Sequence, residues 1–147
     1  MTDPQDLAEA CAEAMFAKDK AARHLGMAIE TVGPGTARLA MTVDERMING
    51  HAICHGGIIF TLADTAFAYA CNAYNRTTVA QHCSVTFLAP AKLGDRLTAE
   101  AVERTRAGRN GIYDIRVTDQ ERNLIAEFRG HSRSIQGTLV PEEKQTP

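Results

Sequence analysis

The chain has 147 residues, of which 44% are hydrophobic and 23% charged, and its formal net charge at pH 7 is −2. This length predicts a single globular domain over 1–147 that can bury a core without disulfides or a structural metal. Charges of both signs are interspersed, so the chain lacks the basic stripe that binding to nucleic acid requires. The first 20 residues contain acidic groups and lack the pattern of a secretory signal, which predicts a cytoplasmic protein.

The N-terminal segment predicts an amphipathic helix over about 4–25. Asp3 and Pro4 supply an N-cap and a first-turn proline, and apolar residues then recur at helical spacing. The next two segments, 27–32 and 36–45, flank the turn sequence GPG, and the second one alternates apolar and polar residues. This pattern predicts a β-hairpin.

The most apolar segment of the chain predicts a helix from about Gly56 to about Ala73. It is too short to span a bilayer and carries Asp64 near its centre, so we expect a buried helix and no membrane association. Four further segments predict strands joined by short turns, which favours antiparallel neighbours. These strands are 77–90, 96–105, 111–120 and 124–135, and the remaining segment at about 137–147 predicts a frayed tail.

The central helix determines the expected fold. A helix that is apolar on all faces must be enclosed, and in a small domain only the sheet can enclose it. We therefore predict an α+β fold in which a curved antiparallel sheet of about six strands wraps around a long central helix. The edges of such a sheet favour pairing with a symmetry-related copy. The chain is thus expected to form a homo-oligomer, a dimer at least, with a sheet continuous across the interface.

Asp64 is the only Asp, Glu, Lys or Arg between Met47 and Asn75, so no ion pair can form within a helical turn of it. A buried aspartate either caps or pairs structurally, or it is held at a site whose surroundings tune it for chemistry. Aspartate is a poor residue for the middle of a helix, and Thr61 and Thr65 add polar groups beside it. The pattern favours a functional site.

The same helix is predicted to begin at His55, Gly56 and Gly57. Unbonded backbone N–H groups and the positive end of the helix dipole meet at such a start, and glycine lets a ligand approach the backbone closely. This start is a candidate oxyanion or anion site, although a Gly-Gly pair is more often only a helix entry. Asp64 lies two turns further on, roughly 10 Å away. A single chain cannot bring both groups to one reacting centre, whereas two antiparallel helices across a dimer axis can.

Two stretches of the sequence carry a resemblance to a known family. The segment NGHAICHGG at 49–57, followed by LADTAFAYACN at 62–72, closely resembles the hotdog-fold acyl-coenzyme A (CoA) thioesterases of the PaaI type. The resemblance continues through FLAPAKLGD, GIYDI and FRGHS, so it covers most of the chain. It implies a hotdog fold assembled into dimers and often tetramers. It also implies hydrolysis of phenylacetyl-CoA or a related aryl-acetyl-CoA ester, with no metal and no cofactor, since CoA is part of the substrate.

The resemblance also implies catalytic roles for individual residues. The backbone N–H of Gly56 would polarise the thioester carbonyl, and Asp64 of the facing subunit would activate water or attack directly. His55 and Asn49 match family positions beside the thioester, where they would orient the carbonyl, the water or the loop. The chemistry suits these groups, because a helix start can stabilise an oxyanion and a carboxylate in a dry pocket is a competent base.

Further groups on the helix, the sheet and the loops would hold the substrate. Those expected to contact it are Gly57, Phe60, Thr65, Ser84, Arg106 and Arg109. The two arginines would bind CoA phosphates, although solvated surface charge explains them equally well. Phe60, with Phe67 and Tyr69, would line the acyl pocket or belong to the core. Ser84 and Thr86 are candidate hydroxyls for holding the water, and Ala80 stands near the position that carries this hydroxyl in some relatives.

Other functions stay open on the sequence. Cys54 and His55 suggest a thiol hydrolase, but neighbouring residues on an extended loop point apart. The spacing of a metal site built from His51, Cys54, His55, His82 and Cys83 is unlike common zinc patterns. Within the fold, the strongest competing enzyme is a hydratase or dehydratase acting on acyl thioesters. A module that binds acyl-CoA without turnover is the competing non-enzymatic function.

Overall fold

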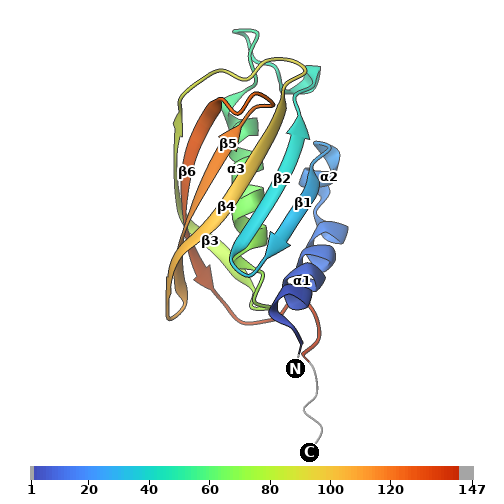
Figure 1. Ribbon diagram of the computed structural model, residues 1–147, viewed down its shortest axis with the longest axis vertical. Coiled ribbons are helices and arrows are strands. Elements are labelled where there is room, and N and C mark those ends of the chain that lie inside the picture. The colour runs from blue at the N-terminus through green and yellow to red at the C-terminus, as the bar shows by residue number, and fades with distance from the viewer. Residues whose placement is uncertain (1, 143–147) are drawn as a thin grey trace, which may run out of the picture.

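The computed structural model describes residues 2–142, which form one six-stranded sheet and a small set of helices (Figure 1). In chain order the elements are α1 (Pro4–Lys18), α2 (Lys20–His24), β1 (Ala28–Gly33), β2 (Thr36–Thr42), the short 3-10 helix η1 (Glu45–Met47), α3 (Gly56–Cys71), β3 (Thr78–Phe87), β4 (Arg96–Ala107), β5 (Asn110–Thr118) and β6 (Leu124–Ser134). All neighbouring strands are antiparallel, in the order β1-β2-β4-β5-β6-β3. The predicted α+β fold, with six strands and one long helix against them, is confirmed.

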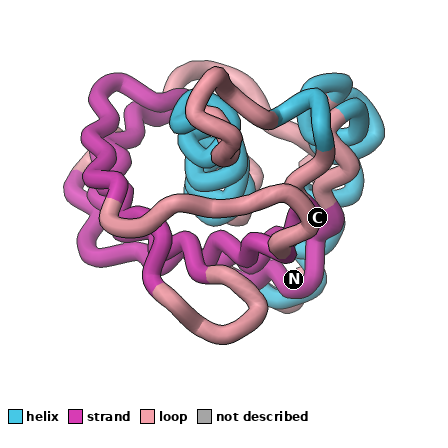
Figure 2. The backbone as a smooth tube through the Cα atoms, turned by 90° about the horizontal axis from the view of Figure 1, so that it is seen from above, coloured by secondary structure: helices cyan, strands magenta, loops and turns pink. Residues whose placement is uncertain are grey.

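The sheet curves around α3, which lies along its inner face (Figure 2). Side chains alternate between the two faces of each strand, and the inward ones, such as Leu39, Ile115 and Phe128, are buried. Gly130 of β6 makes room for the ring of Phe67 on α3, since a Cβ at Gly130 would lie 2.8 Å from three atoms of that ring. The core therefore consists of one helix packed closely into the concave side of the sheet.

The sheet covers α3 incompletely, which differs from the predicted enclosure on all faces. Partly or fully exposed positions recur along the uncovered side of the helix, at Gly57, Thr61, Asp64, Thr65 and Ala68. Their spacing places them on one stripe, called the open stripe below. No helix within residues 2–142 is long and apolar enough to cross a membrane.

The N-terminal segment forms two helices rather than the single helix predicted over about 4–25. The break falls at Asp19, whose backbone (φ −83°, ψ 85°) is not helical. Its carboxylate accepts from the N–H of Ala22 at 3.1 Å, which caps α2, and from the hydroxyl of Tyr69 at 3.3 Å. The helix breaks here because an aspartate that bonds to nearby backbone groups favours a cap over a helix interior.

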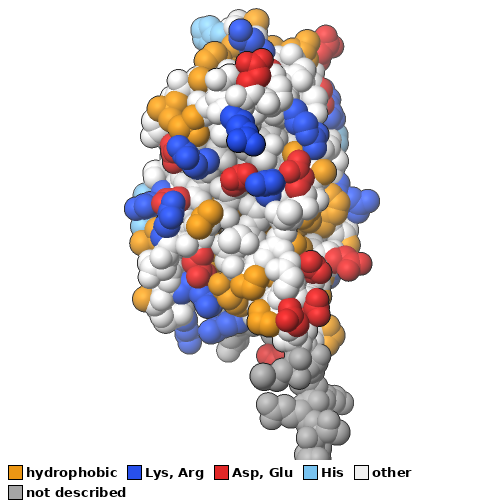
Figure 3. All heavy atoms as spheres, viewed as in Figure 1, with side chains coloured by type: hydrophobic (Ala, Val, Ile, Leu, Met, Phe, Trp, Pro, Cys, Tyr) orange, Lys and Arg blue, Asp and Glu red, His pale blue; other side chains and the backbone are white. Residues whose placement is uncertain are grey.

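Charged side chains of both signs cover the outer face of the sheet (Figure 3). The cross-strand ion pairs on this face are Arg38–Glu100, Arg104–Asp114, Arg116–Glu127 and Arg129–Asp114. Hydrogen bonds from Arg129 and then Arg104 hold the pKa of Asp114 down at about 2. Exposed pairs of this kind add little stability. They keep this face polar.

The two edges of the sheet differ. The helix α1 packs beside β1, whereas no described strand pairs with the outer edge of β3 (Figure 1). β3 contains a bulge between Ala80 and His82, and most of its side chains are exposed. Val79 and Phe87, near its two ends, are 43% and 49% exposed. A free edge is what pairing with a second copy requires, and that pairing stays a prediction.

Part of the predicted tail at about 137–147 is held against the domain. The buried Asn75 has a left-handed backbone (φ 61°), and its Oδ1 accepts from the N–H groups of Leu139 and Val140, both at 2.9 Å. Its Nδ2 donates to the C=O of Val140 at 3.1 Å. The tail is therefore not frayed at this point, because a buried asparagine supplies its hydrogen bonds. Residues 143–147 lie outside the described residues.

Candidate functional site

The loop before α3 is closed by its own hydrogen bonds. The side-chain oxygen of Asn49 accepts from the N–H groups of His51 (2.9 Å) and Ile53 (3.3 Å), which folds the loop back on itself. The N–H of His55 then donates to the C=O of Met47 at 2.7 Å. These bonds fix the position at which α3 begins.

The start of α3 leaves one backbone donor unused. The N–H of Gly57 donates to Nδ1 of His55 at 3.1 Å, so the His55 ring is the N-cap of the helix. The N–H groups of Ile58 and Ile59 donate to the C=O of His55 at 2.9 and 3.3 Å. Among residues 2–142, no acceptor bonds to the N–H of Gly56. Because Nδ1 accepts a hydrogen bond, neutral His55 carries its proton on Nε2, which adds a second donor.

An apolar groove of about 520 Å³ adjoins this helix start. Its lining residues are Asn49, Ile53, Cys54, Gly56, Ile59, Phe87, Leu88, Ala89 and Pro90. The loop after β3 is tied to the other wall, since the N–H of Cys54 donates to the C=O of Ala91 at 2.7 Å. The groove thus combines apolar walls with the few polar groups at the helix start, which is typical of small-molecule sites. Asn49 and Gly56 lie together here, as predicted.

Asp64 lies on the open stripe and has no hydrogen-bond or ion-pair partner within the described residues. Burial raises the pKa of its carboxyl group. Burial, and to a smaller extent the charge of Asp64, also raise the pKa values of the Cys71 and Cys83 thiols, so both thiols lie within its electrostatic influence. An unpaired, partly desolvated carboxylate costs stability and accepts a proton more readily than an exposed one. These properties are typical of a catalytic carboxylate.

The two threonines beside Asp64 bond to their own helix. The hydroxyl of Thr61 donates to the C=O of Gly57 at 2.8 Å, and that of Thr65 donates to the C=O of Thr61 at 2.6 Å. Their hydroxyl hydrogens are therefore already used, and their oxygens can only accept from a ligand. Thr65, which is predicted to contact the substrate, lies on the open stripe.

The two halves of the predicted catalytic centre are apart in one subunit. Gly56 and Asp64 are separated by eight positions of α3, which is about 12 Å along the helix axis. Gly56 opens onto the groove, whereas Asp64 lies on the open stripe. One subunit therefore assembles the helix start with Asn49 and His55 but does not bring Asp64 to it.

Of the three aromatic residues considered for the acyl pocket, only Phe60 has a partly accessible side chain. It contacts Phe128 edge to face at a ring-centroid distance of 5.1 Å. Phe67 and Tyr69 are each 1% exposed, and both belong to the core. Phe67 packs 5.5 Å from the ring of Tyr113. A pocket lined by Phe67 and Tyr69 is thus not present in the subunit, because both rings fill the space between α3 and its neighbours.

Ser84 lies on the outer face of the sheet, on the opposite side from Asp64. It pairs with Arg129 of β6 and lines a shallow outer depression with Thr86. Within one subunit neither hydroxyl can hold a water for Asp64. On the inner face β6 carries Ser132, a buried residue that pairs with Ala80 and lines a small pocket with Cys71 and Tyr74, at the end of α3 away from Gly56. The sequence could not reveal this pairing, because register between distant strands is set by the whole sheet.

Arg106 lies at the end of α3 away from Gly56 and is held by other protein groups. Its Nε lies 3.0 Å from Oε1 of Glu103, and its guanidinium carbon lies 3.6 Å from the centroid of the Tyr74 ring. The hydroxyl of Tyr74 also donates to Glu103, at 3.0 Å. Arg106 therefore has a structural role in this end of the domain, alongside the predicted role in substrate binding.

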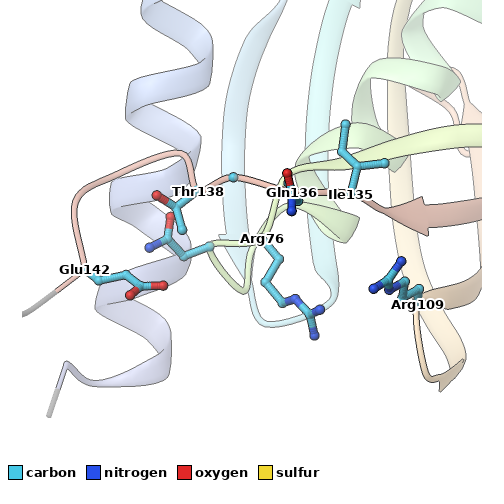
Figure 4. Close-up of a pocket in the computed structure, with 8 residues that line it drawn as sticks. Arg76, Arg109, Ile135, Gln136, Thr138 and Glu142 are labelled. Carbon is cyan, nitrogen blue, oxygen red and sulfur yellow. The ribbon is translucent and has the colours of Figure 1, made fainter.

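Arg109, in the β4–β5 turn, lines a neighbouring pocket of about 530 Å³ (Figure 4). Arg76 from the α3–β3 connection lines the same pocket, although no motif in the sequence marked it as a site residue. Glu142 lies at the end of the pocket away from Arg109 (Figure 4). Two arginines facing one polar pocket can hold an anionic group such as a phosphate.

Comparison with known proteins decides the family. Residues 51–126 match the thioesterase superfamily, and this segment contains His55, Gly56 and Asp64. The chain is 46% identical over 131 residues to the acyl-coenzyme A thioesterase PaaI of Escherichia coli K12, covering 89% of this chain and 94% of that protein. The chain belongs to the PaaI group of the thioesterase superfamily. As a member, it is a thioester hydrolase.

Solved structures confirm the hotdog fold of this thioesterase. The E. coli PaaI protein from the phenylacetic acid degradation operon superimposes with a TM-score of 0.91 at 44% identity, covering 92% of this chain and 99% of that one. A mutant of the phenylacetic acid degradation protein PaaI from Thermus thermophilus superimposes with a TM-score of 0.77 at 32% identity, covering 80% and 100% of the two chains. The resemblance inferred from the sequence motifs is thus confirmed over most of the chain.

Two alternative sites considered from the sequence gain no support in this thioesterase. Burial raises the pKa of the Cys54 thiol to about 11, and Sγ lies 3.7 Å from the C=O of His55 rather than bonding to its ring. Such a thiol stays protonated at neutral pH and is a poor nucleophile. Within residues 2–142, no three His, Cys, Asp or Glu side chains gather as a metal site. All four cysteines are free thiols, as predicted.

Proposed function

We propose that this thioesterase hydrolyses phenylacetyl-CoA, or a related aryl-acetyl-CoA ester, to the free acid and CoA in the cytoplasm. The substrate class is supported by the likeness to an acyl-coenzyme A thioesterase and to a protein of the phenylacetic acid degradation operon. The proposed reaction uses a backbone N–H, an imidazole and a carboxylate. It needs no metal and no cofactor.

The observation that carries the proposal is the unbonded N–H of Gly56 at the apolar groove. The carbonyl oxygen of the thioester would accept from this N–H and from Nε2–H of His55. Both donors are fixed before the substrate binds, and in an apolar groove such donors stabilise the developing oxyanion strongly. The positive end of the α3 dipole acts in the same direction. Asn49 would keep the loop and His55 in place.

Asp64 of a second subunit would supply the base. Its carboxylate takes a proton from water, and the water oxygen attacks the carbonyl carbon of the thioester. The C–S bond then breaks, and CoA leaves as a thiolate that needs no acid. Desolvation supports this role, because it raises the proton affinity of the Asp64 carboxylate. Phe60 and Thr65 on α3, together with Gly57, would contact the substrate around this point.

Two features of the subunit favour a site completed by a second copy: the free edge of β3 and the open stripe of α3. A two-fold axis beside β3 would place the two copies of α3 antiparallel, so that the start of one helix approaches the middle of the other. We therefore propose a homodimer with a continuous sheet, and a tetramer formed from two such dimers. Each site would use Gly56 of one subunit and Asp64 of the other.

The arginines at the far end of the subunit would bind the phosphates of CoA. Arg109 and Arg76 face the polar pocket there, and no ion pair engages either side chain among the described residues. Arg106 lies close by but already pairs with Glu103, so we expect a smaller contribution from it. Antiparallel subunits would bring this end of one copy toward the groove of the other.

The test is release of free thiol from a panel of aryl-acetyl, benzoyl and straight-chain acyl-CoA esters. Gly56→Pro deletes the N–H at a helix position that accepts proline, and the backbone of His55 (φ −60°, ψ 132°) suits a residue before proline. Gly56→Ala is the matched control, because it adds a Cβ but keeps the N–H. We expect the proline variant to have a kcat at least about a hundredfold below that of the alanine variant.

Two outcomes would contradict the proposal at different points. Equal kcat values for the two Gly56 variants would remove this N–H from the mechanism. Absence of thiol release from every ester by the unaltered protein would overturn thioester hydrolysis of this substrate class. Formation of a hydrated or dehydrated acyl-CoA without free thiol would indicate the competing enzyme class.

Site sharing has its own test in hybrid dimers. Asp64→Ala and Gly56→Pro subunits are each inactive in the proposed scheme, but a hybrid dimer retains one intact site. After random subunit exchange, activity should return to about a quarter of the wild-type level, since half of the dimers are hybrids with one working site of two. No recovery despite demonstrated exchange would contradict a site shared between subunits.

A further inference from the structure

Phe87, at the end of the free edge strand β3, is a large apolar side chain that lines the groove and has no role in the proposed chemistry. It is the last residue of β3, is 49% exposed, and lines the groove together with Gly56. Its backbone is fixed, since Phe87 pairs with Ala126 of β6 and the following N–H, of Leu88, donates to the C=O of Ile125 at 2.8 Å. A half-exposed ring on a fixed strand is well placed to contact a ligand.

The ring of Phe87 lies directly against Gly56. A Cβ built on Gly56 would lie 3.0 Å from Cζ of Phe87 and 3.4 Å from Cε1 and Cε2. The tip of the Phe87 ring therefore lies over the Cα of Gly56, whose N–H is the unbonded donor at the helix start. Any larger residue at Gly56 would have to displace this ring. The same ring limits which atoms can approach the N–H from the apolar side of the groove.

We propose that Phe87 is a positioning and specificity-determining residue that sets how much bulk fits beside the thioester carbonyl. This inference rests on the proposed function, in which the carbonyl oxygen accepts from the N–H of Gly56. The carbon next to the carbonyl lies one bond from it, so an acyl group directed along the apolar walls of the groove runs beside Phe87. A CH2 group, as in an aryl-acetyl ester, fits beside the ring. A branched carbon at this position would clash with the Phe87 ring.

The test compares two esters that differ by one methyl group, phenylacetyl-CoA and 2-phenylpropanoyl-CoA. The measured quantity is the ratio of kcat/KM for the branched ester to that for the unbranched ester. Phe87→Ala should raise this ratio at least about tenfold, since one methyl group in a tight apolar pocket changes kcat/KM by roughly 10–200-fold. Phe87→Leu should give an intermediate ratio. The ratio compares two substrates on one sample, so a partly unfolded fraction cancels.

A matched control is available on the outer face of the sheet. Val102 of β4 is also apolar and 42% exposed, but it lies away from the groove. Val102→Ala should leave the ratio at the wild-type value. If both Phe87 variants hydrolyse the two esters with a ratio within about twofold of wild type, the specificity role is refuted while the thioesterase proposal stands. If the wild-type protein releases thiol from neither ester, the proposed function fails and the role of Phe87 fails with it.

Discussion

Replacing Asp64 with asparagine is expected to lower activity and raise stability at the same time. No neighbour on α3 or β3 can take over as the base. The hydroxyls of Thr61 and Thr65 already donate to backbone carbonyls, and burial raises the pKa of the Cys83 thiol, which keeps it protonated. The loss of kcat should therefore lie in the upper part of the range found for removal of a positioned general base. We expect a decrease of about a thousandfold or more, which corresponds to roughly 4 kcal/mol in activation free energy.

The stability change follows from the direction of the Asp64 pKa. Burial raises this pKa above its unfolded value, so the folded state binds the proton more tightly than the unfolded chain does. The ionised carboxylate then costs stability at every pH above the folded pKa, and the cost disappears below the unfolded pKa of about 4. Asparagine carries no charge. The variant should be more stable than wild type at neutral pH, and this advantage should shrink as the pH falls.

Two assays on the same samples check this prediction. Thiol release from phenylacetyl-CoA gives kcat, and thermal unfolding between about pH 3 and pH 8, a range that spans the ordinary aspartate pKa, gives the stability difference. A kcat within about tenfold of wild type would refute the role of Asp64 as the base. A variant that is less stable than wild type at neutral pH would show that Asp64 has a structural partner instead.

Three further sites test the capping and packing around the active site. His55→Ala removes the N-cap and should cost about 1 kcal/mol of stability by thermal unfolding. His55→Asn keeps a capping side chain, so it should restore that stability but not the wild-type kcat. Full activity of the asparagine variant would contradict the role of Nε2–H of His55 as a donor. Gly130→Ala places a methyl 2.8 Å from the Phe67 ring and should cost about 1–3 kcal/mol in a denaturant titration; an unchanged midpoint would mean that this ring moves freely. Asn75→Ala removes its side-chain bonds to the backbone at 139–140, so limited proteolysis should cut the C-terminal segment of this variant first. Equal rates of cleavage there in the variant and in the wild type would show that other contacts hold the segment.

The sequence was sufficient to predict the elements that repeat a simple period. Alternation marked the strands at 36–45, 111–120 and 124–135, turn signals separated the other three, and the apolar segment located α3 to within two residues at its C-terminal end. The helix start at Gly56 and the unpaired Asp64 were both recognisable, because glycine pairs and isolated charges are rare inside apolar helices. These features depend on neighbours in the chain, so they leave a local signal.

Features set by distant contacts left no such signal. Asp19 breaks the N-terminal helix partly through a bond to Tyr69, fifty positions away. Ser84 faces outward because the bulge in β3 fixes which side chains point toward α3. The sequence of β3 does not alternate regularly between apolar and polar residues, so a bulge in it cannot be recognised from the sequence. The closeness of Phe87 to Gly56 depends on the pairing of β3 with β6, which only the folded sheet defines.

The open edge of β3 has a consequence for aggregation. An unpaired strand edge is a template on which any extended polypeptide can add, including an unfolded copy of the same chain. The bulge between Ala80 and His82 interrupts that template, because a bulge bends the strand and breaks the regular ladder of backbone bonds. A foreign strand can pair with only part of the edge. The bulge therefore protects the folded subunit against edge-to-edge misassembly.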